Sequence, residues 1–241
     1  MFREAASFDG AIGSWDVSSV TTMELMFHLA EAFDRDLSEW NVSSVTDMRG
    51  MFWGATSFAG EVESWDVSSV TEMDTMFREA ASFNGAIGNW NVSSVTTMEL
   101  MFHLAEVFDR DLSEWNVSSV TDMRGMFWGA TSFAGEVGSW EVSSVTDMSE
   151  MFRDAEIFDR DLGGWDVSSV NDMSSMFFGV ELSTANYDSM LIGWSDLPVQ
   201  TEVEFHAGDS QYSAGEATDA REVLTDVYGW SISDAGQVEP E

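Results

Sequence analysis

The sequence predicts an α/β repeat solenoid, a right-handed coil of short parallel strands and short helical returns that a C-terminal segment closes. Three observations lead to this prediction. A tryptophan recurs at a constant interval and opens the phrase W-[D/N/E]-V-S-S-V, the apolar spacing changes within each unit, and the chain contains a near-copy of its own N-terminal segment. A fixed period of this length is typical of modules that bury their apolar sides by stacking on copies of themselves. The tryptophans are Trp15, Trp40, Trp65, Trp90, Trp115, Trp140 and Trp165.

Each unit is predicted to begin with a strand and to return through a short helix. Trp40 and Val42 are two residues apart, which is the period of a strand. From Val45 to Phe58 the apolar residues are three or four positions apart, the period of a helical turn. The segment Thr21-Thr-Met-Glu24 has the form of a capping box, which places the start of the helix at the threonine that follows S-S-V.

A block of three turns occurs twice in the chain. Residues 1–64 and 76–139 differ at five positions, so every side chain of the first block has a counterpart in the second. We therefore expect any site on the repeats to occur twice on the same face. The first residues match residues within a later repeat, and we expect the chain to be a piece of a longer protein.

The repeat pattern ends near residue 182, and residues 183–241 form the predicted capping module. Residues 183–194 read as a helix and residues 201–205 alternate as a strand. Residues 218–228 read as an amphipathic helix, and Trp230-Ser-Ile232 repeats the strand motif of the units. We expect this tail to continue the sheet of the solenoid (residues 1–182) and to protect its open end. The segment from Asp234 to the C-terminus is expected to be loose.

The charge balance is strongly acidic. Asp and Glu number 44 against 9 Lys and Arg, for a net charge of -35, and all nine cations are arginine. Because 44% of the residues are hydrophobic, we expect this charge on the surface of a folded protein rather than in a disordered chain. High salt screens such repulsion, so the balance resembles that of proteins from extreme halophiles. A partner role for nucleic acid is excluded, because the chain lacks the cations to neutralise phosphates.

The repeat resembles a known family. The phrase W-D-V-S-S-V-T-D-M-S-x-M-F-x-x-A-x-x-F-D-x-D-L is similar to the repeat of the BspA-like leucine-rich-repeat surface proteins of bacterial and archaeal envelopes. The tail, with T-A-N-Y-D-S-M-L-I-G-W at 184–194, is similar to the C-terminal module of that family. The resemblance implies a leucine-rich-repeat-like solenoid, an extracellular or cell-surface location and a role in adhesion.

The first candidate site is a column of polar residues on the predicted sheet. A residue between two buried strand positions faces solvent, and adjacent turns place equivalent residues about 4.8 Å apart. Such a column could take up cations or a polar ligand, or it could be only the solvated face of a salt-adapted protein. The column comprises Asp16, Asn41, Asp66, Asn91, Asn116, Glu141 and Asp166.

Aromatic side chains form a second candidate. Trp53 and Trp128 are each followed by glycine and occupy a position that His28, Arg78 and His103 hold in other turns. We expect both indoles to be partly exposed, either as anchors for a partner or as packing at the rim. The histidines have no second ligand or nucleophile nearby in the sequence, so no catalytic residue is predicted.

The acidic turns before each strand are the candidate metal sites. In Asp34-Arg35-Asp36, and in the same motif at residues 109–111 and 159–161, the arginine is expected to bridge carboxylates of neighbouring turns. Calcium is the alternative occupant, because hard cations prefer several oxygen ligands, but none of these stretches has a calcium-loop motif. No cofactor is predicted beyond calcium or monovalent cations.

The sequence favours a non-enzymatic adhesion or recognition module that binds a surface protein or a polysaccharide over an extended face. The alternatives are a structural envelope spacer or cation-binding solenoid without a macromolecular partner, an enzyme, and a hydroxyl array that binds ice or mineral. No membrane-spanning segment is predicted.

Overall fold

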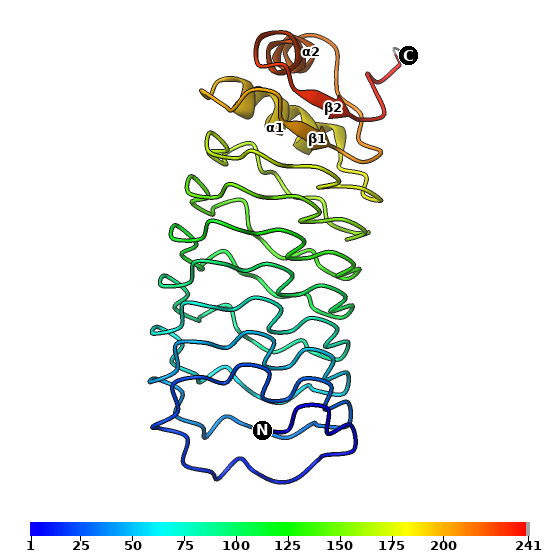
Figure 1. Ribbon diagram of the computed structural model, residues 1–241. Helices are drawn as coiled ribbons and strands as arrows, with labels where there is room; N and C mark the ends of the chain where they lie inside the picture. Colours follow the sequence, from blue (N-terminus) through cyan, green and yellow to red (C-terminus); the bar gives the residue numbers. More distant parts are fainter. Residues whose placement is uncertain (240–241) are drawn as a thin grey trace.

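The computed structural model describes residues 1–239 and consists of successive turns of chain stacked along one axis (Figure 1). Parallel bridges join one position of each turn to the same position of the next, from Thr22↔Asp47 through Asp147↔Asp172. Backbone hydrogen bonds follow the same interval of about one unit, such as the 2.8 Å bond from Met23 N to Asp47 O. The chain is therefore a repeat protein whose unit is one turn of the stack.

The predicted helical return is wrong. Across residues 1–182 the chain forms a run of tight turns, and the first helix begins at Thr184. Met51 N bonds to Met48 O at 3.1 Å and Ala55 N bonds to Phe52 O at 3.0 Å, and each of these bonds closes a tight turn between residues i and i+3. Gly50 and Gly54 have φ values of 57° and 69°, a left-handed conformation that ends a helix. The apolar spacing of three and four therefore arises from consecutive turns.

The predicted strand at Trp40–Val42 is also wrong. Trp40 N bonds to Leu37 O, and Val45 N bonds to Val42 O, so a tight turn closes on each side of this segment. Pairing between turns begins a few residues later, at the bridge position that Asp47 occupies. Two turns so close together leave no length for a strand, so the short parallel strands expected of the repeats are isolated bridges, and within residues 1–239 the two strands lie in the tail.

The threonines after S-S-V bond between turns rather than capping helices. Thr46 Oγ1 donates to Thr21 O at 3.2 Å, and Thr71 Oγ1 donates to Thr46 O at 3.2 Å. The backbone N–H of each threonine bonds to the same carbonyl. Each threonine therefore fastens its turn to the preceding one, and this explains why the residue recurs.

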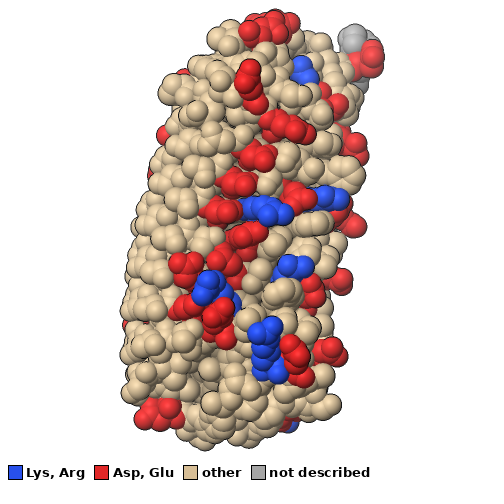
Figure 2. All heavy atoms as spheres, viewed as in Figure 1, with Lys and Arg blue, Asp and Glu red and all other residues tan. Residues whose placement is uncertain are grey.

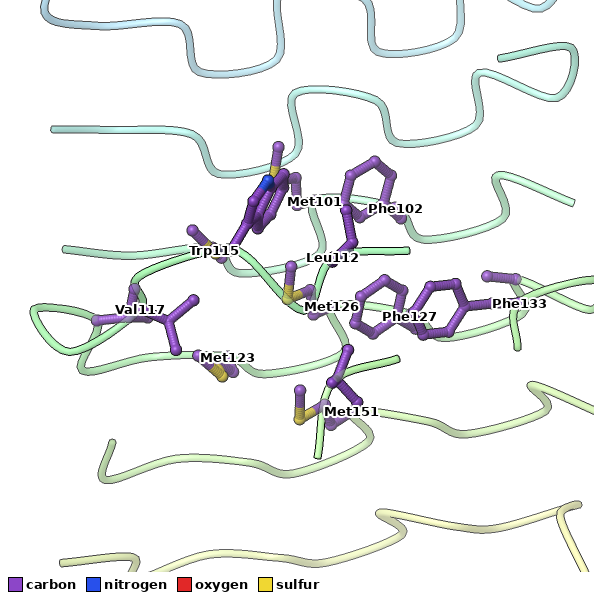
Figure 3. Packing of buried hydrophobic residues seen from close by; sticks show 14 of the residues in the cluster. Met101, Phe102, Leu112, Trp115, Val117, Met123, Met126, Phe127, Phe133 and Met151 are labelled. Carbon is purple, nitrogen blue, oxygen red and sulfur yellow. The ribbon is translucent and has the colours of Figure 1, made fainter. Parts of the chain in front are cut away.

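The core is a set of apolar columns that run along the axis (Figure 3). The rings of Trp65 and Trp90 are 6.2 Å apart and only 5° from parallel, and those of Phe52 and Phe77 are 5.6 Å apart. Trp90 Nε1 donates to Val62 O at 3.2 Å, which satisfies the one polar group of a buried indole. Because each ring packs on its counterparts, the stacking continues through the array.

The tail adds regular elements to the last turn (Figure 1). Helix α1 (Thr184–Ser195) is followed by strand β1 (Glu204–His206), helix α2 (Glu216–Glu222), the π-helical turn η1 (Val223–Val227) and strand β2 (Ser231–Ser233). These elements lie where helices and strands were predicted, except that the second helix changes to π geometry at its C-terminal end.

The tail also continues the stacking direction of the repeats. A parallel bridge joins Met173 to Phe205, and β1 pairs in parallel with β2. The expectation of a loose C-terminal segment is wrong for its described part, since Ala235 N bonds to Ser210 O at 3.0 Å and Val238 N bonds to Tyr212 O at 2.9 Å. The rest of that segment, residues 240 and 241, lies outside the described residues.

Candidate binding surface

The first candidate column, which we call the corner row, is Asp16, Asn41, Asp66, Asn91, Asn116, Glu141 and Asp166. Asp16 Oδ1 accepts hydrogen bonds from Ser18 N at 3.1 Å and Ser18 Oγ at 2.6 Å, and Asn41 accepts the same pair from Ser43. These bonds lower the pKa of Asp16, so its carboxylate is ionised at neutral pH. Asp166 is half-buried and the other six members are exposed.

The corner row therefore lies at a corner of each turn and not on the face of a sheet. One oxygen of most members holds the local turn, as the bond from Ser68 N to Asp66 Oδ1 at 3.1 Å also illustrates. Their other oxygen or amide group points to solvent. The row can accept or donate hydrogen bonds along the axis, but many of its hydrogen-bonding groups are already bonded within their own turns.

The two tryptophans lie in a row of side chains that occupy one position of successive turns. Trp53 is half-buried between His28, whose ring centroid is 4.6 Å away with an interplanar angle of 60°, and Arg78, whose guanidinium carbon is 4.6 Å from the ring. Trp128 lies between His103, at an interplanar angle of 49°, and Arg153. This row, which we call the stacked row, comprises His28, Trp53, Arg78, His103, Trp128, Arg153 and Phe178. An arginine lies over one face of each indole, and both indoles are partly exposed.

The histidines of the stacked row are buried and neutral at neutral pH. His28 is 8% exposed and His103 is 7% exposed, and Nδ1 of each has no hydrogen-bond partner within residues 1–239. Burial, with the charge of Arg78 as the next cause, lowers the pKa of His103 to about 4. Burial also lowers the pKa of His28, with Arg3 as the next cause. A neutral imidazole without a bound partner offers no acid–base pair to a substrate.

The Asp-Arg-Asp turns fasten adjacent units together. Arg35 forms an ion pair with Asp9 of the preceding turn, and Arg160 forms one with Glu136 at 3.0 Å. Asp34 Oδ1 accepts the backbone N–H of Ala59 at 3.0 Å. Arg35 and Arg160 thus each pair with one carboxylate of the preceding turn, whereas Arg110 donates to the backbone carbonyl of Asn84 instead. In the described part of the chain, no three His, Cys, Asp or Glu side chains converge in a way that could hold a metal ion.

A row of carboxylates at the bridge position of five turns was not predicted from the sequence. This acid row consists of Asp47, Glu72, Asp122, Asp147 and Asp172, with Thr22 and Thr97 in the same register. Burial raises the pKa of Asp122, and the like charge of Asp147 raises it further. The available signal was the acidic residue two positions after S-S-V, which the capping-box interpretation assigns to the first turn of a helix.

Arginines partly offset the charge of the acid row and of the carboxylates beside it. Arg49 Nη2 lies 2.8 Å from Asp47 Oδ2, and Arg124 Nη1 lies 3.2 Å from Glu99 Oε1. Figure 2 shows the resulting band of acidic side chains along the stack, with arginines beside it. These pairs are solvent-exposed on the arginine side, so each contributes at most about 1 kcal/mol. The band remains an acidic surface with few fixed charges of opposite sign.

The hollows of the surface are open. One of them has a volume of about 460 Å³ and is lined by Ser38, Glu61, Glu63, Ser64 and Asn89. The corner, stacked and acid rows are thus the most extensive organised features of the surface.

Among residues 1–239 no helix is both long and apolar enough to span a bilayer.

Comparison with known proteins places these repeats in a family. The family described as "Mycoplasma protein of unknown function, DUF285" matches three overlapping stretches, residues 1–85, 58–141 and 112–196. No curated protein and no solved structure matched the chain. The matches span most of the chain and include all seven tryptophan repeats, so this repeat protein belongs to the DUF285 family.

Proposed function

We propose that this protein is a non-enzymatic recognition module that binds a macromolecule along the axis of the stack. The observation that supports this proposal is that the corner and stacked rows have one member in each of seven turns, and the acid row has a carboxylate in five of the seven. A ligand that is itself extended or periodic can contact several equivalent groups at once. Weak contacts then add through a high effective concentration.

The ligand class we favour is a polysaccharide or an extended surface protein. The three-turn block presents Trp53 and Trp128 at the same register, so a repeating ligand can meet the same set of groups twice. The partly exposed indoles and the free oxygens of the corner row supply apolar contact and hydrogen bonding. The hollow lined by Ser38, Glu61 and Ser64 is open rather than enclosed, which favours a long ligand over a small one.

We further propose that the family relationship extends to the BspA-like surface proteins and that the coil is a right-handed, leucine-rich-repeat-like solenoid. Residues 1–182 would form that solenoid and residues 183–241 its cap. The protein would then act outside the cell or on its surface. The tail supports this assignment, since α1 and β1 continue from the last repeat.

A binding titration tests the proposal. The immobilised chain is exposed to a neutral linear polysaccharide and, separately, to polyarginine in molar potassium chloride, where exposed charges are screened within about 3 Å. We expect the polysaccharide to bind and polyarginine not to bind under these conditions. A variant with Trp53→Ala and Trp128→Ala should lose binding, whereas Asp147→Asn, in the acid row, should retain it. Binding of polyarginine alone, with no effect of the tryptophan changes, would contradict the proposal.

We also propose that the acidic surface is an adaptation to high salt. A net charge of -35 over exposed rows of carboxylates opposes compactness, and monovalent salt should relieve that repulsion. We expect the unfolding midpoint to rise steadily with sodium or potassium chloride into the molar range. A flat response to both salts, with a large effect of millimolar calcium at fixed ionic strength, would instead support the alternative of a cation-binding spacer without a macromolecular partner.

A further inference from the structure

We propose that Asn84 is a site of spontaneous deamidation and that Arg110 holds the aspartate that forms. The two copies of the three-turn block differ at this position, because Asn84 of the second copy corresponds to Asp9 of the first. The first copy therefore already contains the side chain that the reaction would produce in the second. The proposal concerns a covalent change of the chain and is independent of what the surface binds.

The residue that follows each asparagine singles out Asn84. Of the seven asparagines, Asn84 alone precedes glycine, and the others precede valine, tryptophan, aspartate or tyrosine. The attacking atom in deamidation is the backbone nitrogen of the following residue. Glycine has no Cβ, so its nitrogen can approach the side chain with the least hindrance, whereas a β-branched valine obstructs that approach.

The structure leaves the reacting groups without hydrogen-bond partners. Within residues 1–239, neither the Gly85 N–H nor the Asn84 Nδ2 amide donates to a protein acceptor. Asn84 Oδ1 accepts the backbone N–H of Asp109 at 3.1 Å, so the side chain is held by its oxygen alone. The nucleophile and the leaving group can therefore react without the loss of an existing bond of their own.

The chemistry requires only water. The Gly85 nitrogen attacks Asn84 Cγ, a new N–Cγ bond forms, the Cγ–Nδ2 bond breaks, and ammonia leaves with the proton of the attacking N–H. Water then opens the succinimide ring at one of its two carbonyls. Opening at one carbonyl yields aspartate at position 84, and opening at the other yields isoaspartate, in which the main chain passes through the side-chain carbon.

The first block shows that the aspartate product fits. Asp9 Oδ1 accepts Asp34 N at 3.2 Å, as Asn84 Oδ1 accepts Asp109 N. Arg35 donates through Nε to Asp9 O at 3.1 Å and forms an ion pair with the Asp9 carboxylate.

Arg110 is placed to do the same for the product. It already donates to Asn84 O through Nε at 2.9 Å and through Nη2 at 2.6 Å. Deamidation would give this guanidinium the carboxylate that Arg35 already has. The new charge therefore arises beside an arginine, even though the chain as a whole is acidic. The isoaspartate form has no counterpart in the first block and would displace the bond to Asp109 N.

The test is to incubate the intact folded chain at mildly alkaline pH and to follow its mass over time. Cleavage after Arg78 and Arg110 yields a single peptide that contains Asn84, Asn89 and Asn91. We expect a gain of one dalton that fragmentation locates at Asn84, on the order of tenfold faster than at its two neighbours because only Asn84 precedes glycine. Equal rates at the three sites in the folded chain would overturn the assignment of the site.

A second measurement tests the role of Arg110. We expect the Asn84→Asp variant to unfold at the same or a higher midpoint than the parent chain in low salt, and this advantage to disappear in the background of Arg110→Gln. An equal loss of stability on Asn84→Asp in both backgrounds would show that Arg110 does not hold the product.

Discussion

The repeat array and the tail bury aromatic rings in opposite ways. In the array, Trp140 and Trp165 lie 6.3 Å apart with planes within 4° of parallel. In the tail, the Phe205 ring meets Phe177 at 82° and Trp230 at 69°. Identical units related by a translation repeat one orientation, so offset-parallel stacking follows. The tail breaks the translation, and its rings adopt the edge-to-face geometry common where neighbours differ.

Side-chain hydrogen bonds also differ between the two regions. In the array, indole and threonine donors bond to backbone carbonyls of adjacent turns. In the tail, the Asp234 side chain is 4% exposed and accepts Tyr187 Oη at 2.7 Å and Arg221 Nε at 2.8 Å. The array thus repeats neutral bonds between turns and has ion pairs only at its surface, whereas the tail contains a charged cluster with a buried carboxylate.

The largest expected effect is the loss of a central stacked ring. Trp140 packs between Trp115 and Trp165, so Trp140→Ala removes contacts on both sides and should lower the free energy of unfolding by about 3 to 5 kcal/mol. Trp230→Ala in the tail should cost less, because Trp230 has fewer stacked neighbours. Denaturant unfolding of both variants measures the difference. Equal losses would remove the distinction between array and tail.

The charged cluster of the tail should be the next most sensitive feature. Asp234→Asn leaves the Arg221 guanidinium without its ion pair and weakens the bond from Tyr187, which should cost about 2 to 3 kcal/mol. Asp196→Asn in the same tail, which is exposed, serves as the matched control and should have little effect. Urea midpoints compare the two variants. A neutral outcome for Asp234→Asn would mean that the ion pair and its hydrogen bonds add nothing to the tail.

The stability of the array should depend on pH through a histidine of the stacked row. The pKa of His103 is lowered from 6.5 to about 4 in the folded chain, so the unfolded chain binds the proton first. The stability that neutral His103 contributes is complete above pH 6.5 and is lost as the pH falls toward 4, at roughly 1 kcal/mol per unit. Raised pKa values at Asp122 and Glu99 act in the opposite direction.

The His103→Phe variant separates these contributions, because the carboxylates are unchanged and phenylalanine already occurs in this row at Phe178. Its unfolding midpoint should fall less than that of the parent chain between pH 7 and pH 5. Arg78 and Glu79 are the charged groups that act on His103, and both are unchanged in the variant. Parallel pH profiles of variant and parent would contradict the expectation.

The smallest effect should be the removal of a carboxylate from the acid row. Because the folded state disfavours the charge on Asp122, Asp122→Asn should be neutral or slightly stabilising at low salt, within about 0.5 kcal/mol. This outcome is opposite in sign to that of Asp234→Asn in the tail. The free energy of unfolding at low and molar salt would check it. A loss comparable to that of Asp234→Asn would show that the acid row is structural.

The sequence by itself determined the period, the buried positions and the helix at the start of the tail. Trp40, Val42, Val45 and Phe58 were assigned to the core from their spacing, and all four are buried. Residues 183–194 were predicted as a helix, and α1 spans Thr184–Ser195. Such features follow from the order of apolar side chains along the chain, which periodicity reads directly.

The backbone conformation between the core positions depends on contacts between turns, which exist only in the tertiary structure. Leu25 and Leu29 have φ values of 53° and 56°, which leucine disfavours, and the bonds from Leu25 N to Arg49 O and Leu29 N to Trp53 O hold them there. A Cβ on Gly50 would lie 2.6 Å from Leu25 Cδ2, so a larger residue at this position would require the leucine side chain to move. These glycines were the signal against a helix.

Which residues form each surface row is likewise not predictable from the sequence. The corner row can be recognised because its members follow tryptophan, but the sequence pattern places them on a sheet and does not reveal the acid row. That Trp53 lies between His28 and Arg78 depends on contacts between residues a full turn of the stack apart. Such contacts are set by where the backbone turns each corner, and the turns are fixed by hydrogen bonds to neighbouring units that an isolated repeat does not have.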